Sequence, residues 1–175
     1  MTEQIYTGEK CTKILEKNTH KGMEYLIVTY GSHPCCYVEI PENHYLFGKS
    51  YYEDEEIDSI NCHGGITFAS RRNFGFGENY YIGWDYKHFG DYNANAQVYE
   101  NAKKWTIKEL EKHCEDVINQ IIENEAKFIT QEQQEKNLYD DLYSVIEPYI
   151  GNTIGINEKG EFDIIQAVKD LLESK

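Results

Sequence analysis

The stretch MEYLIVTYGSHPCCYVEI, residues Met23–Ile40, decides the fold. Two runs rich in β-branched and aromatic residues, Met23–Tyr30 and Cys35–Ile40, flank the turn-forming tetrapeptide Gly-Ser-His-Pro. This pattern predicts a β-hairpin. Pro41 ends its second strand, because proline has no N–H to donate to a strand ladder. We therefore expect an antiparallel sheet at the centre of the protein.

The segments on either side of the hairpin predict further elements. Residues Met1–Lys21 form a polar lead-in, with a short helix expected around Thr12–Lys17. Apolar and polar residues alternate over Ile60–Phe68, which predicts a half-buried strand. A glycine-rich loop or hairpin turn is expected over Arg71–Asn79, followed by a strand over Tyr80–Asp85.

The hydrophobic period changes after the last predicted strand. Apolar residues between Ala94 and Phe128 recur at helical spacing, which predicts one or two long amphipathic helices covering the sheet from about Ala96. Thr106 with Glu109 three residues later fits a capping box and predicts a helix start. The predicted fold class is α+β.

The C-terminal part of the chain predicts a helical appendage. Residues Gln131–Asn137 are wholly polar and form either a linker or an exposed turn of helix. Two helical stripes follow, Leu138–Tyr149 and Phe162–Leu172, which predict a short helical hairpin. Such helices bury little alone, so we expect them to pack on the main body or on another copy of the chain. The predicted domains are a core over 1–130 and an appendage over 137–175.

Charge and composition exclude several classes of protein. The chain has 17 basic and 31 acidic residues, a net charge of −14, and such a surface repels nucleic acids and anionic membranes. The acidity serves solubility, or it mimics nucleic acid toward a basic partner. The sequence lacks an apolar run of roughly 20 residues, as a membrane span requires, and shows no secretory signal. Five cysteines without CxxC spacing are typical of reduced thiols, so we expect a cytoplasmic protein.

One glycine-rich block carries most of the residues with chemical potential. It reads INCHGGITFASRRNFGFGENYYIGWDYKHFGDY and spans Ile60–Tyr92. Its His63-Gly64-Gly65 sequence either points backbone N–H groups at an anion or forms a β-bulge. Both arginines of the chain, Arg71 and Arg72, follow; they are either phosphate-binding forks or exposed loop residues.

The spacing Asp85-x-x-His88-x-x-Asp91 is the second feature of this block. With His63 and His44 as possible partners, these three residues have the donor types of a divalent metal site. Alternatively, Asp85, His88, Asp91 and His63 do general acid–base work without a metal, or the carboxylates only hold the turn and orient His88. The sequence therefore leaves open whether the protein binds a cofactor, such as a divalent metal.

Aromatic residues crowd the same block, and they form core or, beside arginine, stack a nucleobase. Trp84 is the candidate for stacking. Lys49 and His44 lie in the preceding aromatic loop. The candidate ligand-binding residues are His44, Lys49, His63, Gly64, Gly65, Thr67, Arg71, Arg72 and Trp84.

An ordered series of short motifs runs through the first half of the chain: Tyr37-Val38-x-Ile40-Pro41-x-x-His44, Gly48-Lys49-x-Tyr51, His63-Gly64-Gly65-Ile66-Thr67-Phe68 and Gly83-Trp84-Asp85-x-x-His88-x-Gly90-Asp91. This series resembles a family of small proteins from bacteriophage and prophage genomes. Trp84 and Lys87 replace the usual phenylalanine and alanine of this family, and residues from Asn137 onward look like an addition. The resemblance implies no established activity, but it implies one shared site or fold nucleus containing His44, His63, Gly64, Gly65, Thr67, Asp85, His88, Gly90 and Asp91.

Three functions are consistent with these observations. The first is a phage counter-defence protein that sequesters a nucleotide-derived signal or blocks a host defence factor. The second is a small hydrolase, with or without a metal, acting on a phosphorylated or nucleotide substrate. The third is an acidic inhibitor that mimics nucleic acid. For each we expect a cytoplasmic location, which is the host cytosol if the protein is phage-encoded, and a homo-oligomer built through the C-terminal helices.

Overall fold

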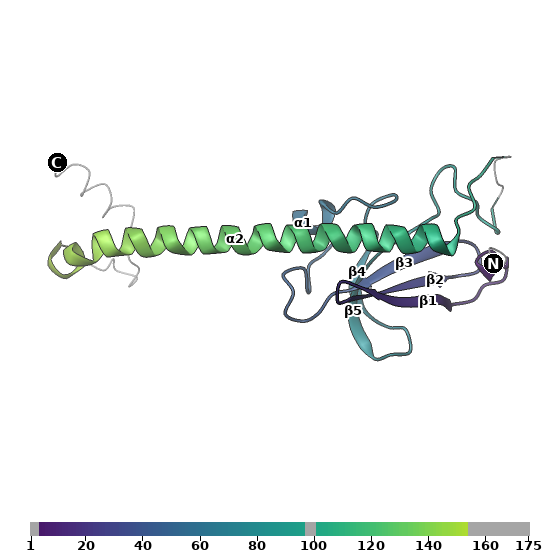
Figure 1. Cartoon of the computed structure of the whole chain (residues 1–175), viewed down its shortest axis with the longest axis horizontal. Helices are drawn as coiled ribbons and strands as arrows, with labels where there is room; N and C mark the ends of the chain where they lie inside the picture. The colour runs from purple at the N-terminus through teal and green to yellow at the C-terminus, as the bar shows by residue number, and fades with distance from the viewer. Residues whose placement is uncertain (1–3, 97–100, 154–175) are drawn as a thin grey trace. The chain divides into compact units, whose positions relative to one another are not determined.

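A five-stranded antiparallel sheet and one long helix form the part of the chain that the structure describes (Figure 1). The computed structural model describes the backbone of residues 4–96 and 101–153 and the side chains of residues 4–96 and 101–144. The sheet has the order β1-β2-β3-β5-β4, which confirms the predicted α+β fold. The elements are β1 (Lys13–His20), β2 (Met23–Thr29), β3 (Pro34–Glu39), α1 (Glu55–Asp58), β4 (Phe68–Asn73), β5 (Glu78–Asp85) and α2 (Ile107–Thr153).

The predicted hairpin is confirmed as β2 and β3, which are the second and third strands of the sheet. Tyr25 pairs with Val38, and both side chains are buried in the main hydrophobic cluster. The neighbouring residues Leu26 and Tyr37 belong to a second cluster. Because alternate residues of a strand face opposite sides, β2 and β3 are buried on both faces, which explains their nearly continuous apolar sequence.

The N-terminal segment is a strand, so the short helix predicted around Thr12–Lys17 is wrong. β1 pairs with β2 from Lys13 opposite Thr29 to His20 opposite Met23. Lys21 and Gly22 connect the two strands, both with positive φ, at 47° and 88°. Two positive φ values are the requirement of a type I′ hairpin turn. Pairing with the open edge of β2 therefore overrides the weak helical tendency of this polar segment.

The predicted strand over Ile60–Phe68 is also wrong, because the chain turns there. Gly64 and Gly65 have φ values of 74° and 83°, which interrupt an extended strand. The strand that pairs with β5 is β4, and it begins at Phe68. The loop predicted over Arg71–Asn79 is confined to the turn between these two strands, while the strand predicted over Tyr80–Asp85 is confirmed within β5.

Helix α2 begins where the capping box predicts. The Glu109 carboxylate accepts hydrogen bonds from the Thr106 backbone N–H at 2.9 Å and from its hydroxyl at 2.8 Å, and the Glu109 N–H donates to the Thr106 hydroxyl at 3.3 Å. These bonds, with the ammonium of Lys103, lower the pKa of Glu109 to about 2. The buried face of α2 packs on the main cluster of the sheet through Leu110, Cys114, Val117, Ile118 and Ile121.

The chain divides into two compact units, Met1–Glu125 and Ala126–Lys175. The polar segment Gln131–Asn137, expected as a linker or an exposed turn of helix, is helical and belongs to α2. Within the second unit, the side chains of residues 126–144 are almost all exposed. The helix predicted at Phe162–Leu172, and with it the helical hairpin, lies outside the described residues. None of the helices in the described ranges is long and apolar enough to cross a membrane.

Candidate acid–base site

A buried carboxylate and a half-buried imidazole form the centre of the site. His63 Nε2 lies 2.7 Å from Asp91 Oδ2, and the two side chains are 26% and 3% exposed. The indole N–H of Trp105 donates to Asp91 Oδ1 at 2.8 Å, and the backbone N–H of His88 donates to Oδ2 at 3.0 Å. Both carboxylate oxygens are therefore held by donors, as a buried charge requires.

The hydrogen bonds decide the ionisation of Asp91. Burial raises the pKa of this carboxyl, but the bonds from His63, Trp105 and the His88 backbone outweigh burial and leave the pKa below its ordinary value. Asp91 is thus a carboxylate near neutral pH. A carboxylate only accepts hydrogen bonds, so the proton of the bond lies on His63 Nε2, and Nδ1 is the ring nitrogen left to accept a proton.

The backbone fixes Asp91 and Trp105 beside each other. Asp91 forms an isolated parallel bridge with Lys103, whose N–H donates to the Gly90 carbonyl at 2.7 Å. Trp105 follows two residues later, two positions before the first residue of α2. The ring of His63 stacks on that of Tyr86, with 4.8 Å between centroids and 8° between planes. His63 therefore has a defined ring plane as well as a defined proton position.

A cavity of about 230 Å³ separates the His63 segment from helix α2. His63 and Cys62 line it on one side, and His113 and Asp116 line it from the helix. Gln120 joins the two walls: its amide accepts the Asn61 N–H and donates to the Asn61 carbonyl, both at 2.9 Å. This pair of bonds holds the two sides of the cavity at a fixed separation.

Sequence reasoning missed His113, Tyr86 and Trp105 as site residues. His113 Nδ1 lies 2.8 Å from the Tyr86 hydroxyl, and its ring contacts that of Trp105 at 5.0 Å. Burial, followed by the neighbouring His63, lowers the pKa of His113. The available signal was a histidine beside the buried positions Leu110, Cys114 and Val117 of a predicted helix, where a polar residue requires a partner.

The structure brings the predicted residues Asp85, His88 and Thr67 next to this site. His88 and His63 are in ring contact at 5.2 Å, and His88 Nε2 lies 3.8 Å from Asp85 Oδ1. The Thr67 hydroxyl donates to Asp85 Oδ2 at 3.3 Å. His88 Nε2 is buried and makes no hydrogen bond among the described residues. Asp85, His88, Asp91 and His63 thus lie close together, and their acid–base role stays a prediction.

The predicted metal site at Asp85, His88 and Asp91 is not formed. The described ranges contain no group of three or more His, Cys, Asp or Glu side chains that could hold a metal ion. The physical reason is that each carboxylate is used by the turn itself. Asp85 Oδ1 accepts the Lys87 N–H at 3.0 Å, and Asp91 accepts hydrogen bonds from three donors.

The backbone of His63-Gly64-Gly65 does not form the predicted anion-binding nest. The Gly65 N–H donates to the Cys62 carbonyl at 3.2 Å and closes a turn. A Cβ atom on Gly64 would lie 1.8 Å from His88 Nε2, so the His88 ring occupies the space that any side chain here requires. Gly64 is needed for the close approach of His88, and Gly65 for its positive φ.

The two arginines lie away from the site and on opposite faces of β4, since they are consecutive in a strand. Arg71 pairs with Glu42 at 3.2 Å, whereas Arg72 lies over the ring of Phe74. Arg71 is opposite Tyr80 in the sheet, and Tyr86 follows Tyr80 by six steps of extended chain, roughly 20 Å. The prediction that the arginines and the His63 segment bind one phosphate is wrong.

Three further residues that were predicted to contact a ligand make contacts within the protein instead. Trp84 is 1% exposed and donates its indole N–H to the Tyr86 hydroxyl, so it cannot stack a base. Lys49 pairs with Glu56 at 2.8 Å. His44 lies against Glu125, which is twelve residues and roughly 18 Å of helix from His113. His44 therefore belongs to a different part of the sheet unit.

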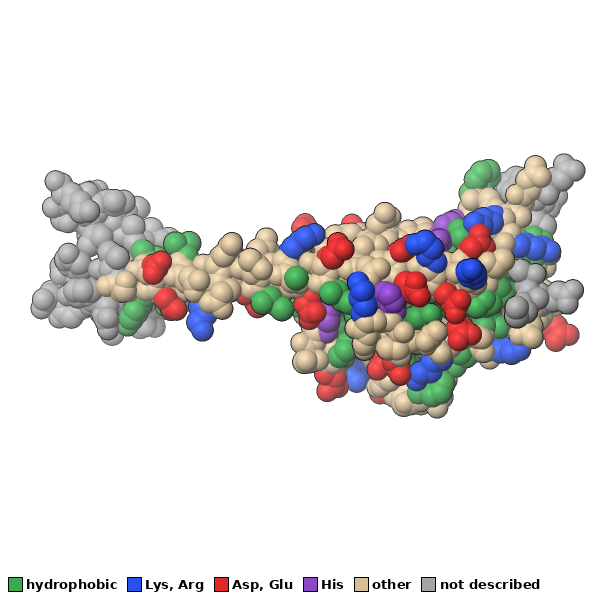
Figure 2. Space-filling model, viewed as in Figure 1, with side chains coloured by type: hydrophobic (Ala, Val, Ile, Leu, Met, Phe, Trp, Pro, Cys, Tyr) green, Lys and Arg blue, Asp and Glu red, His purple; other side chains and the backbone are tan. Residues whose placement is uncertain are grey.

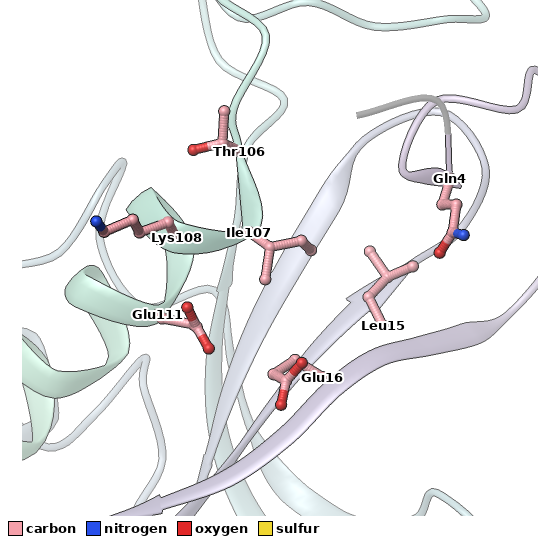
Figure 3. A pocket seen from close by; sticks show the side chains of 7 residues that line it. All are labelled: Gln4, Leu15, Glu16, Thr106, Ile107, Lys108 and Glu111. Atoms are coloured by element: carbon pink, nitrogen blue, oxygen red, sulfur yellow. The ribbon is translucent and has the colours of Figure 1, made fainter. Parts of the chain in front are cut away.

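A larger cavity, of about 460 Å³, lies at the start of α2 and has a different chemical character (Figure 3). Glu111 from α2 and Glu16 from β1 face each other across it. Burial, then the charge of Glu16, raises the pKa of Glu111. Two carboxylates repel an anion, and Lys108 is the single basic residue among the lining residues. This cavity does not fit a phosphorylated ligand either.

No model of a protein family, no curated protein and no solved structure matches this chain.

Proposed function

We propose that the protein is a small hydrolase in which His63, held by Asp91, is the general base. The observation that carries the proposal is the 2.7 Å contact between a buried, ionised carboxylate and the Nε2 of an imidazole that lines a cavity. A carboxylate that fixes the tautomer of a histidine and stabilises its charged form is the arrangement by which many hydrolases activate a nucleophile.

In this proposal each residue has a separate task. His63 Nδ1 takes a proton from a water molecule in the cavity as the oxygen attacks the substrate. Asp91 stabilises the imidazolium that forms, because its charge lies against Nε2. Trp105 and the His88 N–H hold the carboxylate in place. Tyr86 keeps the ring plane of His63 by stacking on it.

The cavity favours a small substrate without a phosphate group. Its volume of about 230 Å³ is below the roughly 300–1,000 Å³ of pockets that bind drug-sized ligands. None of the described residues that line it is Lys or Arg, while Asp116 adds a carboxylate to its wall. A phosphate group in this cavity would therefore have no lysine or arginine side chain lining it to pair with. We propose a small uncharged substrate in place of the phosphorylated one expected from the sequence.

Chromogenic esters test this proposal. We expect the purified protein to hydrolyse 4-nitrophenyl acetate with saturation kinetics, and to leave 4-nitrophenyl phosphate intact. Turnover of the acetate should persist in the presence of a metal chelator. Saturable hydrolysis of the phosphate ester would contradict the substrate assignment. A rate on the acetate equal to that of free imidazole at the same concentration would contradict the proposed function.

The other functions expected from the sequence stay predictions. Sequestration of a nucleotide-derived signal was expected to use phosphate contacts from Arg71 and Arg72 and a base contact from Trp84. These three side chains do not lie together at the site. Mimicry of nucleic acid calls for a continuous acidic surface, and basic side chains lie among the acidic ones on the face seen in Figure 2. A phage origin, a counter-defence role and a cytoplasmic location likewise stay predictions.

A second copy of the chain is the partner we propose for the second unit. Leu138 and Tyr139 are 70% and 59% exposed, and Leu142 and Tyr143 continue the same helix face one turn later. Exposed apolar side chains grouped in this way are typical of an interaction surface. Sedimentation equilibrium tests this: Leu138→Glu should shift the protein toward monomer, whereas an unchanged mass would contradict the proposal.

A further inference from the structure

The hydroxyl of Tyr86 can donate one hydrogen bond, and it has one good acceptor within reach. The indole N–H of Trp84 donates to this oxygen at 3.0 Å, and the thiol of Cys36 lies 3.9 Å away as a weak donor. An indole cannot accept a hydrogen bond. His113 Nδ1, at 2.8 Å, is therefore the acceptor of the phenol proton.

This assignment fixes the tautomer of His113. With Nδ1 accepting from Tyr86, the neutral ring carries its proton on Nε2. Burial raises the pKa of Tyr86, so the phenol stays protonated, and burial lowers the pKa of His113, so the imidazole is neutral near pH 7. His113 Nε2 has no hydrogen-bond partner among the described residues.

The two imidazoles of the cavity thus have opposite proton positions. His63 is protonated on Nε2 by its bond to Asp91 and has a lone pair on Nδ1, whereas His113 has a proton on Nε2. Both rings line the same cavity. Both also contact the same two aromatic rings, since Trp105 lies 4.9 Å from His63 and 5.0 Å from His113. One ring accepts a proton, and the other donates a hydrogen bond.

We infer that His113 is a second catalytic residue, whose Nε2–H donates to the oxyanion that forms when water attacks a substrate carbonyl. The inference rests on the proposed role of His63 and names the substrate class as small uncharged esters or amides. A neutral imidazole is a suitable donor, because it stabilises a developing negative charge without giving up its proton. Tyr86 acts through His113 as a positioning residue.

The two histidines and the water molecule account for every proton that moves in this step. The water oxygen bonds to the carbonyl carbon while one water proton moves to His63 Nδ1. The π electrons of the carbonyl move to its oxygen, which accepts the hydrogen bond from His113 Nε2. The tetrahedral adduct then collapses, the bond to the leaving group breaks, and that group takes the proton from His63 Nδ1. Both histidines return to their starting forms.

The tautomer is measured without any substrate. A long-range ¹H–¹⁵N spectrum of the ¹⁵N-labelled protein shows which ring nitrogen carries the proton. We expect an unprotonated Nδ1 and a protonated Nε2 for His113, and a disturbed His113 pattern in Tyr86→Phe, which keeps the ring and removes the hydroxyl. The resonances of His20, which bonds Asn119, should not move and serve as control. A protonated Nδ1 in His113 would overturn the inference.

The catalytic role is measured with 4-nitrophenyl acetate and its substituted variants. His113→Met retains an apolar side chain of similar length but lacks the donor, and we expect kcat to fall by roughly 100- to 1,000-fold with little change in KM. His113→Gln retains an N–H donor near the position of Nε2, so it should recover part of this loss. Circular dichroism of both variants checks that they fold.

The outcomes separate the two claims. A wild-type protein without saturable ester hydrolysis overturns the proposed function, and the role of His113 with it. A wild-type protein that loses activity with His63→Gln but keeps it with His113→Met retains the proposed function and overturns the inference. Equal losses of kcat in His113→Met and His113→Gln also overturn it, because a donor would then make no difference.

Discussion

The carboxylate of Asp91 meets the ring of His63 at 2.7 Å although 28 residues separate them in the chain. Two tight turns produce this contact. The first is the Gly64-Gly65 turn, and in the second the Asp91 N–H donates to the His88 carbonyl at 3.0 Å. Since Asp91 also receives the indole N–H of Trp105, the pair joins both loops to the start of α2. The pair is a structural centre of these loops as well as the proposed catalytic pair.

Asp91→Asn tests the carboxylate. The amide nitrogen cannot accept the bonds from His63 or His88, so we expect the unfolding free energy to fall by about 2–3 kcal/mol. Ester hydrolysis should fall roughly 10²- to 10⁴-fold, because the amide no longer stabilises the charged ring. Urea denaturation and initial rates measure the two effects.

Asp116→Asn is the matched control for stability, because Asp116 lines the same cavity but pairs with the exposed Lys112 outside it. Its effect on the unfolding free energy should stay within about 0.5 kcal/mol. Equal destabilisation by the two substitutions would contradict the central position of Asp91 in the fold.

Gly64→Ala and Gly65→Ala form a second matched pair. Both positions have positive φ, so both substitutions strain the backbone by about 1–2 kcal/mol. A Cβ at Gly65 meets nothing within 4 Å, whereas one at Gly64 collides with the ring of His88. We therefore expect Gly64→Ala to be the more destabilising in urea denaturation and to shift the His88 resonances. Gly65→Ala with the larger loss would contradict this packing.

Stability should fall as the pH is lowered through the range of histidine titration. Burial lowers the pKa of His33, His44 and His113 in the folded protein. The unfolded chain therefore binds protons first, below its ordinary pKa of about 6.5, and the stability present above this pH is lost as the pH falls. The pKa of Glu111 is raised in the folded protein, so protonation of this carboxyl increases the stability as the pH falls further.

Urea denaturation at pH 7 and pH 5 measures this dependence. We expect a smaller unfolding free energy at pH 5, with about 1.4 kcal/mol for each pKa unit of lowering. The difference between the two pH values should shrink in His113→Gln, which removes one of the titrating groups. A protein that is equally stable at both pH values would contradict the burial of these histidines.

Local sequence patterns predicted the parts of the fold that local chemistry determines. The β2–β3 hairpin followed from a turn sequence between two β-branched runs, and the start of α2 followed from Thr106 and Glu109. β1 was missed because its residues are mostly polar and it is stabilised by pairing with β2, a contact outside its own window. The apolar–polar alternation similarly carries no information about the backbone φ, so it could not predict the positive values at Gly64 and Gly65.

The site was predicted in part for the same reason. His63, His88, Asp85 and Asp91 were identified because glycine-rich loops bring such residues together. Arg71 and Arg72 were misassigned because nearness in sequence does not give nearness in space along a strand. His113 was not predictable from its own neighbourhood, since its role depends on Tyr86, 27 residues away.

Hydrolysis of 4-nitrophenyl acetate by His63→Gln tests the central claim most directly. Glutamine fills much of the imidazole space but cannot take a proton, so kcat should fall by roughly 100-fold or more with a small change in KM. His20→Gln, which removes a histidine outside the cavity, should keep the wild-type rate and thereby exclude non-specific imidazole catalysis. A His63→Gln protein as active as the His20→Gln protein would contradict the account.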